Sequence, residues 1–184
     1  METTSRKTNK TILTNKGLYF DFEDPTNHPF DIEEIAHALS HICRFTGHVK
    51  HFYSVAQHSV NCSWMAPKSL ELTTLMHDAS EAYLGDVSTH LKRMLPEYMK
   101  IEEQVEEALA LKFGTFYPLP QEVKDIDGRM LMTEVRDLMP KVKRQDWPKY
   151  EDYPGFNVVR SWPPEEAKQR FLDRYNKLKG INQP

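Results

Sequence analysis

The spacing of apolar residues constrains the fold of this chain more than any other feature. From residue 31 onward, apolar side chains recur every three to four residues in most segments, which is the period of an amphipathic α-helix. Prolines, glycines and capping residues divide this pattern into separate helices. The predicted helices run over residues 31–47, 54–66, 69–79, 96–114, 120–139 and 164–178. The sequence therefore predicts an α-helical domain.

Three regions depart from the helical period. Residues 1–10 are polar and are predicted to be disordered. Residues 12–22 carry alternating apolar side chains on both sides of Asn15-Lys16-Gly17, which predicts a short β-hairpin. Residues 140–163 form an irregular segment rich in proline and aromatic residues, among them Trp147. These aromatic residues favour packing against the core or a second subunit over a mobile lid.

Composition limits the classes of function. A length of 184 residues suits one domain, and a net charge of −3 argues against a protein that coats duplex DNA. The sequence contains neither a long apolar run typical of a membrane span nor a secretory signal at its start. Its two cysteines form no CxxC pair and suit a reducing compartment. We therefore expect a single-domain cytoplasmic protein with no membrane partner and no stable nucleic-acid partner.

Polar residues within apolar helical patterns indicate a metal site. His77 and Asp78 follow apolar turns, so we expect them at the end of a helix and at the edge of the core. Burying an imidazole beside a carboxylate is costly unless a partner such as a divalent cation holds both. His58 and Asp127 interrupt two further apolar helix faces. Two histidines and two carboxylates are a ligand set suited to Mn, Fe, Co, Ni or Zn.

Other charged residues suggest the chemistry at such a site. Glu81 follows Asp78 by one helical turn, and Asp86 comes directly after Gly85, which is expected to end the helix. Nearby carboxylates of this kind can orient water or transfer a proton. Three cations, Arg44, Lys92 and Lys124, are candidates to bind an anionic substrate. The combination predicts metal-assisted hydrolysis of a phosphate ester.

Each of these residues also has a structural explanation. A lone His-Asp pair is usually structural, and Asp127 alone could cap a helix or pair with a cation. His37 and His41, spaced i, i+4 with Arg44 and His48 further along, form a rival metal set, but they lack the intervening glutamate of a metalloprotease. Cys43 and Cys62 are interpreted as core thiols.

The run from His77 to Lys92, HDASEAYLGDVSTHLK, together with His58 and Asp127, resembles the HD-domain phosphohydrolase superfamily. The similarity spans roughly residues 30–140. It is greatest to the branch that contains bacterial 5′-deoxynucleotidases and phage deoxynucleoside triphosphate triphosphohydrolases, notably small dATP-specific enzymes. The resemblance implies an all-α HD-domain helical bundle, with the short hairpin at its N-terminus, that spans residues 1–184 as one domain.

The resemblance also implies roles for individual residues. The metal ligands would be His58, His77, Asp78 and Asp127, with Co, Mn, Zn or Fe as the ion and Mg as a further ion bound with the phosphates. Glu81 would position the attacking water and Asp86 would handle the proton. Arg44, Lys92 and Lys124 would bind phosphate. Relatives tend to have tryptophan after the arginine, and this chain has Phe45 instead, which makes selectivity for deoxyribose less secure.

The expected function is a metal-dependent nucleotide phosphohydrolase that acts on deoxynucleotides, with triphosphate release from dATP favoured over the 5′-deoxynucleotidase reaction on monophosphates. Three alternatives stay open: hydrolysis of another phosphoester such as a cyclic or signalling nucleotide, a non-catalytic sensor that keeps the metal, and a structural module. The family analogy further implies a homo-oligomer, either a dimer or a hexamer.

Overall fold

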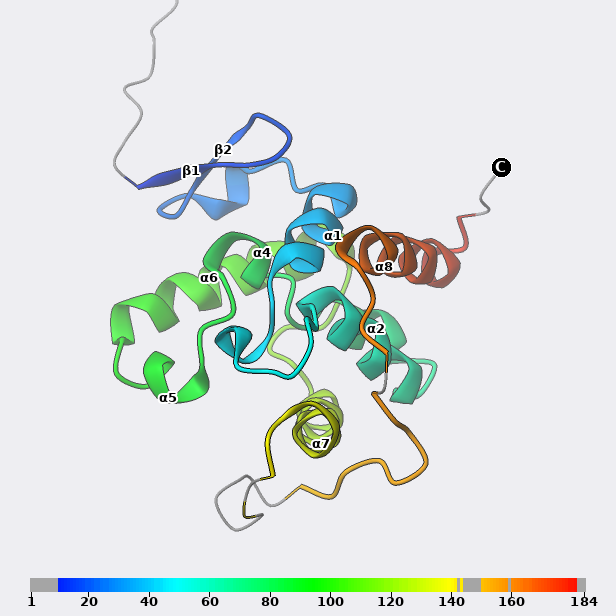
Figure 1. Cartoon of the computed structure of the whole chain (residues 1–184). Helices are drawn as coiled ribbons and strands as arrows, with labels where there is room; N and C mark the ends of the chain where they lie inside the picture. The colour runs from blue at the N-terminus through cyan, green and yellow to red at the C-terminus, as the bar shows by residue number, and fades with distance from the viewer. Residues whose placement is uncertain (1–9, 142, 144–149, 159, 182–184) are drawn as a thin grey trace, which may run out of the picture.

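The computed structural model describes residues 10–141, 143, 150–158 and 160–181 (Figure 1). The predicted disorder of residues 1–9 and the side chain of Trp147 lie outside the described residues. Within them the chain is mostly helical, with one hairpin near the N-terminus, as the sequence predicts. The elements are β1 (Thr11–Leu13), β2 (Tyr19–Asp21), a 3₁₀ turn η1 (Pro25–Asn27), α1 (Ile32–His41), a 3₁₀ turn η2 (Phe45–Gly47), α2 (Val55–Met65), α3 (Glu71–Leu75), α4 (Glu81–Leu84), α5 (Thr89–Lys92), α6 (Pro96–Phe113), α7 (Gln121–Leu138) and α8 (Pro164–Lys179).

Strong local signals set several of these boundaries. The Ser54 hydroxyl caps α2 by accepting a hydrogen bond from the Gln57 amide. Pro96 opens α6, and Gly114, with a φ of 70°, ends it in the left-handed conformation. In the hairpin, Ile12 pairs with Phe20, whose side chain is fully buried. These elements were predicted correctly because a few neighbouring residues determine each of them.

Other boundaries differ from the prediction. The first helix ends at His41 instead of continuing to Gly47, because the chain turns into a bridge between Cys43 and Ser54. The helix expected to begin at Ser69 starts at Glu71, without a side-chain cap, and ends at Leu75. The short helices α4 and α5 were not predicted as separate elements.

Asp31 and Glu34 have the spacing of a capping box at the start of α1, but only half of the box is formed. The Asp31 side chain accepts hydrogen bonds from the Glu33 and Glu34 amides, as expected of an N-cap. The Glu34 side chain does not complete the box. It turns inward, where its Oε1 accepts a hydrogen bond from the Tyr83 hydroxyl at 2.8 Å and lies 2.8 Å from His28 Nε2. Glu34 therefore ties α1 to α4.

Helix α8 lies beside α1 and α2 and closes the main core (Figure 1). Fully buried members of this core include Ile35, Leu39, Val60, Leu75 and Phe171. No described helix is both long and apolar enough to cross a membrane.

A smaller core joins α2 to α7 and includes the segment that precedes α8. Buried Val158, with half-buried Tyr153 and Phe156, packs there against Tyr53 and Met130. The described part of residues 140–163 contains no helix or strand, as predicted, and its aromatic side chains pack against the core.

Candidate metal centre

Helix α2 places His58 in the interior. Its side chain is fully buried, and its Nδ1 lies 2.5 Å from Glu134 Oε1. Because a carboxylate faces Nδ1, that nitrogen carries a proton, and Nε2 is the ring nitrogen that faces the cluster. His58 Nε2 lies 3.3 Å from His77 Nε2. Two imidazole nitrogens therefore face one point.

The turn between α3 and α4 supplies the second histidine and a carboxylate. His77 and Asp78 lie in this turn, whereas the sequence analysis expected them at the end of a helix. The His77 Nδ1 donates to the Thr74 carbonyl at 2.7 Å, which directs Nε2 toward His58. Asp78 places Oδ1 at 3.3 Å from His77 Nε2 and Oδ2 at 3.5 Å from His58 Nε2.

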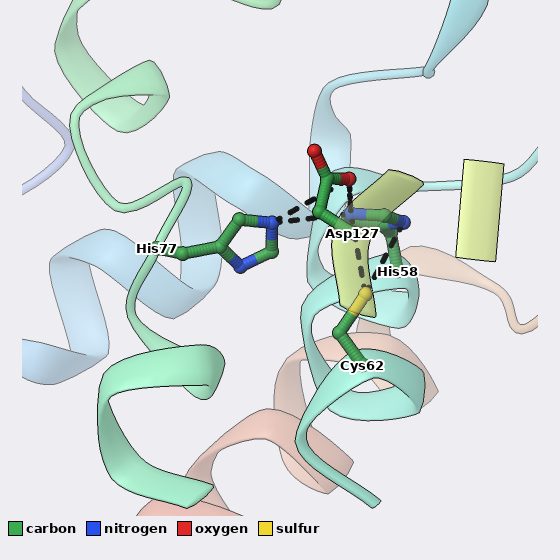
Figure 2. A group of neighbouring side chains, drawn as sticks. All are labelled: His58, Cys62, His77 and Asp127. Carbon is green, nitrogen blue, oxygen red and sulfur yellow. Dashed lines mark hydrogen bonds and ion pairs between the residues drawn. The ribbon is translucent and has the colours of Figure 1, made fainter. Parts of the chain in front are cut away.

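Helix α7 completes the cluster. Asp127 Oδ1 lies 3.1 Å from His58 Nε2 and 3.8 Å from His77 Nε2. Figure 2 shows this carboxylate between the two imidazoles. The structure thus brings together the four residues that the resemblance assigns as ligands, from α2, the α3–α4 turn and α7.

Cys62 also belongs to this neighbourhood, although the sequence analysis treated it as a core thiol. Ligand atoms of His58, Cys62, His77 and Asp127 all lie within 4.8 Å of one another, so this group could hold a metal ion. Cys62 Sγ lies 3.5 Å from Nε2 and 3.8 Å from Nδ1 of His58. Burial raises the pKa of this thiol to about 11, which disfavours the thiolate that binds metals. The i, i+4 spacing from His58 was the sequence signal for this contact.

The electrostatics of the cluster favour a bound cation. Burial lowers the pKa of His77, but the carboxylates of Asp78 and Asp127 outweigh burial and raise it above its usual value. Burial raises the pKa of Asp127, yet the imidazoles of His58 and His77 hold it well below its usual value. The carboxylates attract positive charge to the point that both imidazoles face.

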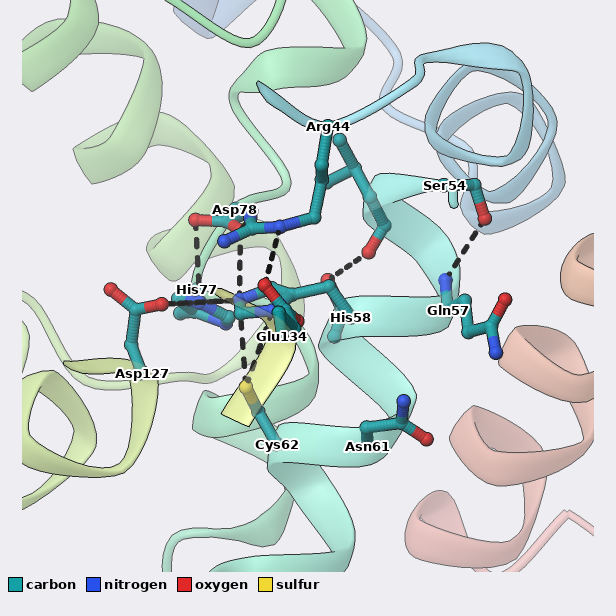
Figure 3. Close-up of polar contacts among 12 residues, drawn as sticks. Arg44, Ser54, Gln57, His58, Asn61, Cys62, His77, Asp78, Asp127 and Glu134 are labelled. Atoms are coloured by element: carbon teal, nitrogen blue, oxygen red, sulfur yellow. Dashed lines mark hydrogen bonds and ion pairs between the residues drawn. The ribbon is translucent and has the colours of Figure 1, made fainter. Parts of the chain in front are cut away.

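Behind His58 lies a buried carboxylate whose role the sequence analysis missed. Glu134 is fully buried and accepts a hydrogen bond from the Tyr53 hydroxyl at 2.9 Å and another from Arg44 Nε at 3.1 Å (Figure 3). The sequence signal was its position on the apolar stripe of α7, two helical turns after Asp127. Its partners are 76, 81 and 90 residues away, beyond the reach of a local pattern.

A cavity of about 700 Å³ opens beside the cluster. Most of the predicted site residues line it: Arg44, Phe45, Asp78, Glu81, Asp86, Lys92 and Asp127. The sequence analysis did not predict Thr46, His90, Arg93 and Leu131, which also line it. Lys124 is exposed and is absent from the described residues of the cavity wall.

The two acids that follow His77-Asp78 have unusual environments. Glu81 is buried, and its Oε2 has no hydrogen-bond partner among the described residues. Burial, followed by repulsion from Asp78 and Asp86, raises the pKa of Glu81 well above its usual value. Burial also raises the pKa of Asp86, although Arg44 opposes this shift. Raised pKa values of this kind are typical of groups that exchange protons.

The cations differ in how they are held. The Arg44 guanidinium is buried, with Nε on Glu134 and NH1 3.4 Å from Asp78 Oδ2. Lys92 forms an ion pair with Glu102 at the cavity wall. Two carboxylates therefore hold Arg44 in place, whereas the charge of Lys92 is already balanced by Glu102.

The turn that carries Phe45 has an unusual backbone. Phe45 and Thr46 have φ values of 56° and 53°, which non-glycine residues rarely adopt. Strained conformations of this kind concentrate at functional sites. The turn places Phe45 on the cavity wall, with its ring centroid 5.6 Å from Arg44 Cζ.

The other predicted metal set, around His37 and His41, has no third metal ligand beside the pair among the described residues. The rings of His37 and His41 lie 4.3 Å apart, and His41 Nδ1 bonds to the His37 carbonyl. Within the described part of the chain, the group around His58 is the single cluster able to hold a metal ion. That cluster is therefore the candidate metal site.

Comparison with known proteins identifies relatives. No family model matches the chain. The uncharacterized protein RCAP_rcc00048 of Rhodobacter capsulatus is 32% identical over 118 residues, which cover 59% of this chain and 60% of that protein. The uncharacterized protein YfdR of Escherichia coli K12 is 41% identical over 170 residues, which cover 91% of this chain and 94% of YfdR. At that identity and coverage, the chain belongs to the same family as YfdR.

Proposed function

We propose that this protein is a metal-dependent phosphohydrolase of deoxynucleotides that releases triphosphate from dATP. One observation carries the proposal. A single cavity is lined by two carboxylates of the metal cluster, by two further acids with raised pKa values and by cations able to bind phosphate. This combination suits phosphate-ester hydrolysis better than ligand sensing, because a sensor has no need of the additional acids.

The residues present fit a divalent transition ion. His58 and His77 each turn Nε2 toward the same point, and Asp78 and Asp127 offer oxygens, the mixed set that Mn, Fe, Co and Zn accept. Both Asp78 oxygens lie within 3.5 Å of an imidazole nitrogen. Asp78 is therefore a better fourth ligand than Cys62, whose thiol holds its proton. When bound, the ion would act as a Lewis acid toward a phosphoryl oxygen.

The protein's own side chains would carry the remaining steps. Glu81, with one buried oxygen unpartnered, would orient the attacking water. Asp86, whose raised pKa lets it hold a proton nearer neutrality, would protonate the leaving oxygen. Arg44 would bind the phosphate and stabilise the charge that develops on it.

The apolar part of the wall would hold the nucleoside. Phe45, Val87 and Leu131 line the cavity together with the charged residues. The Phe45 ring, beside Arg44, would stack on the base or sugar.

The positions of the lysines favour a second candidate, 5′-deoxynucleotidase activity on monophosphates. A triphosphate needs more positive charge than a monophosphate. Lys92 already pairs with Glu102, and Lys124 lies away from the described cavity wall. Arg93, which does line the cavity, is the remaining cation for a polyphosphate.

A hydrolysis panel would test both candidates. All dNTPs, dNMPs and their ribose counterparts are incubated with the protein and Co²⁺, Mn²⁺, Zn²⁺ or Mg²⁺, and the products are separated by ion-exchange chromatography. We expect deoxyadenosine and triphosphate from dATP, whereas inorganic phosphate from dNMPs would identify the second candidate. Glu81→Gln serves as the inactive control. Nucleotide binding without turnover in every condition would reject both activities in favour of a sensor.

A further inference from the structure

One buried carboxylate contacts both sides of the candidate site. Glu134 Oε1 lies 2.5 Å from Nδ1 of His58, and Glu134 Oε2 accepts from Arg44 Nε at 3.1 Å. The Tyr53 hydroxyl donates to Oε1 at 2.9 Å and in turn accepts from Asn61 Nδ2 at 3.0 Å. The side chains of this network other than Glu134 are all at least nine-tenths buried: Arg44, Tyr53, His58 and Asn61. Glu134 is therefore held rigidly and has no access to a substrate.

The two histidines of the cluster are oriented by different means. His77 Nδ1 donates to the carbonyl of Thr74, three residues earlier, so local backbone geometry sets its ring. The His58 ring depends instead on a side chain 76 residues away on another helix. A histidine that donates to a carboxylate keeps one tautomer and becomes a stronger metal ligand. A single substitution at Glu134 would therefore free the His58 ring to turn.

The same carboxylate fixes the cation at the cavity. Arg44 reaches the cavity wall from the loop after α1, outside the helices that carry His58 and Asp127. Its guanidinium is held between Glu134 and Asp78, with the NH1–Asp78 distance at 3.4 Å. Movement of Glu134 would therefore displace a metal ligand and the cation together.

We propose that Glu134 is a positioning residue that sets the spacing between the metal ligand His58 and the phosphate-binding Arg44. The part that concerns Arg44 rests on the proposed function, whereas the part that concerns His58 requires only that the cluster binds a metal. A purely structural role would instead let Glu134 stabilise the α2–α7 junction without altering the site.

The chain contains a matched control for the structural role. Glu34 is 3% exposed, and its Oε1 contacts a histidine nitrogen and a tyrosine hydroxyl, His28 Nε2 and Tyr83 OH, both at 2.8 Å. This trio has the same composition as Glu134, His58 and Tyr53, and it lies outside the described cavity wall. Glu34→Gln therefore removes an equivalent buried charge away from the metal.

Co²⁺ binding to the full-length protein, measured by calorimetry without nucleotide, tests the inference. We expect Glu134→Gln to weaken Co²⁺ binding by about 10- to 100-fold, the usual effect of losing a carboxylate behind a metal-bound histidine. Glu34→Gln should lower the melting temperature by a similar amount and leave Co²⁺ binding unchanged. Equal Co²⁺ affinities for the two variants would overturn the proposal.

Further variants separate this inference from the proposed function. If Glu134→Gln does not fold, Tyr53→Phe removes one donor to the same carboxylate and should weaken Co²⁺ binding by a smaller factor; unchanged affinity would count against the proposal. Glu134→Asp keeps the charge but shortens its reach, so it should restore part of the affinity. If the wild type hydrolyses nucleotides, Glu134→Gln should also raise KM through Arg44. Loss of Co²⁺ affinity in a protein without hydrolase activity would support the positioning role and reject the proposed function.

Discussion

The candidate site has two sides, here called the helix wall and the turn wall, that are built in different ways. The helix wall consists of His58 on α2 and Asp127 and Glu134 on α7, and the side-chain hydrogen bonds of Glu134 join it to residues 76 or more positions away. The turn wall consists of residues 76–93, which carry His77, Asp78, Glu81, Asp86 and Lys92 on two short helices and their connections. Local backbone bonds and the positive φ of Gly85, 79°, shape the turn wall. Long-range packing therefore sets one half of the site, and local geometry sets the other.

The largest expected effect follows from removing one ligand from either wall. Asp78→Ala on the turn wall and Asp127→Ala on the helix wall should each abolish metal content and turnover, because each removes one of the two anionic ligands and leaves the imidazoles with a single carboxylate. Asp125→Ala, on the exposed side of α7, is the control and should keep both. The test is the metal content of the purified variants. If a variant keeps its metal at full stoichiometry, the substituted carboxylate is not a ligand.

Glu81→Ala tests whether this residue of the turn wall acts in catalysis without binding the metal. Glu81 lines the cavity but is not among the residues that surround the two imidazoles. We expect the metal to stay bound and kcat to fall by about 10²-fold or more. An unchanged kcat would reject its role in orienting water.

The cation paired with the helix wall, Arg44, and a cation of the turn wall, Lys92, should differ in their effect on stability. Arg44→Ala leaves Glu134 buried without its cation, so the free energy of unfolding should fall by about 3–5 kcal/mol, and KM should rise. Lys92→Ala removes a partly exposed ion pair with Glu102 and should cost less than about 1 kcal/mol. Urea denaturation of both variants tests this contrast. Equal losses would mean that the walls do not differ in rigidity.

Acid stability tests how the turn wall is anchored to α1. Burial raises the pKa of Glu34, but the hydrogen bonds it accepts, including those from His28 and Tyr83, outweigh burial and lower the pKa below its usual 4.5. A lowered pKa stabilises the folded state above the unfolded value, and this stability is lost as the pH falls through the folded value. The wild type should therefore lose stability below about pH 4.5, and Glu34→Gln should lose less over that range. The variant should start about 1–3 kcal/mol lower at neutral pH, and parallel pH curves would contradict the assignment.

The smallest effects concern the exposed cations. Arg93→Ala should raise KM about two- to five-fold, as expected for an exposed contact of ~0.5–1 kcal/mol. Lys124→Ala should leave KM and kcat unchanged, since its side chain is exposed away from the described cavity wall. A rise in KM for Lys124→Ala alone would place the phosphates outside the described cavity wall.

The sequence predicted those features that short segments determine. Helical period, the cap at Ser54 and the end at Gly114 gave α2, α6, α7 and α8 nearly to their observed limits. The split between α3 and α4 escaped prediction, because apolar spacing continues through His77 and Asp78 while the backbone turns. The end of α1 escaped it too, since that end depends on the bridge to Ser54.

The residues of the candidate site also fall into two groups: those that a local sequence pattern predicts and those that depend on distant partners. Residues of the turn wall lie within one continuous run, from His77 to Lys92, and a pattern in the sequence could single them out. The role of Glu134 escaped prediction, because its partners Arg44, Tyr53 and His58 lie far away in the chain. Lys124 is exposed and lies outside the described cavity wall, which its spacing from Asp127 on α7 does not reveal.

Next to Asp127, α7 carries a glycine whose missing side chain has a consequence for mutational scanning. A Cβ atom at Gly128 would lie only 2.4 Å from Cε2 of Tyr150, in the segment that packs on the outer side of the helix. An alanine there would push the aromatic ring away and strain the helix turn that bears Asp127. In an activity screen, substitutions at Gly128 would then resemble those of a catalytic residue. Gly128 takes no part in the reaction; it leaves space for the Tyr150 ring, so that the helix turn with Asp127 keeps its place.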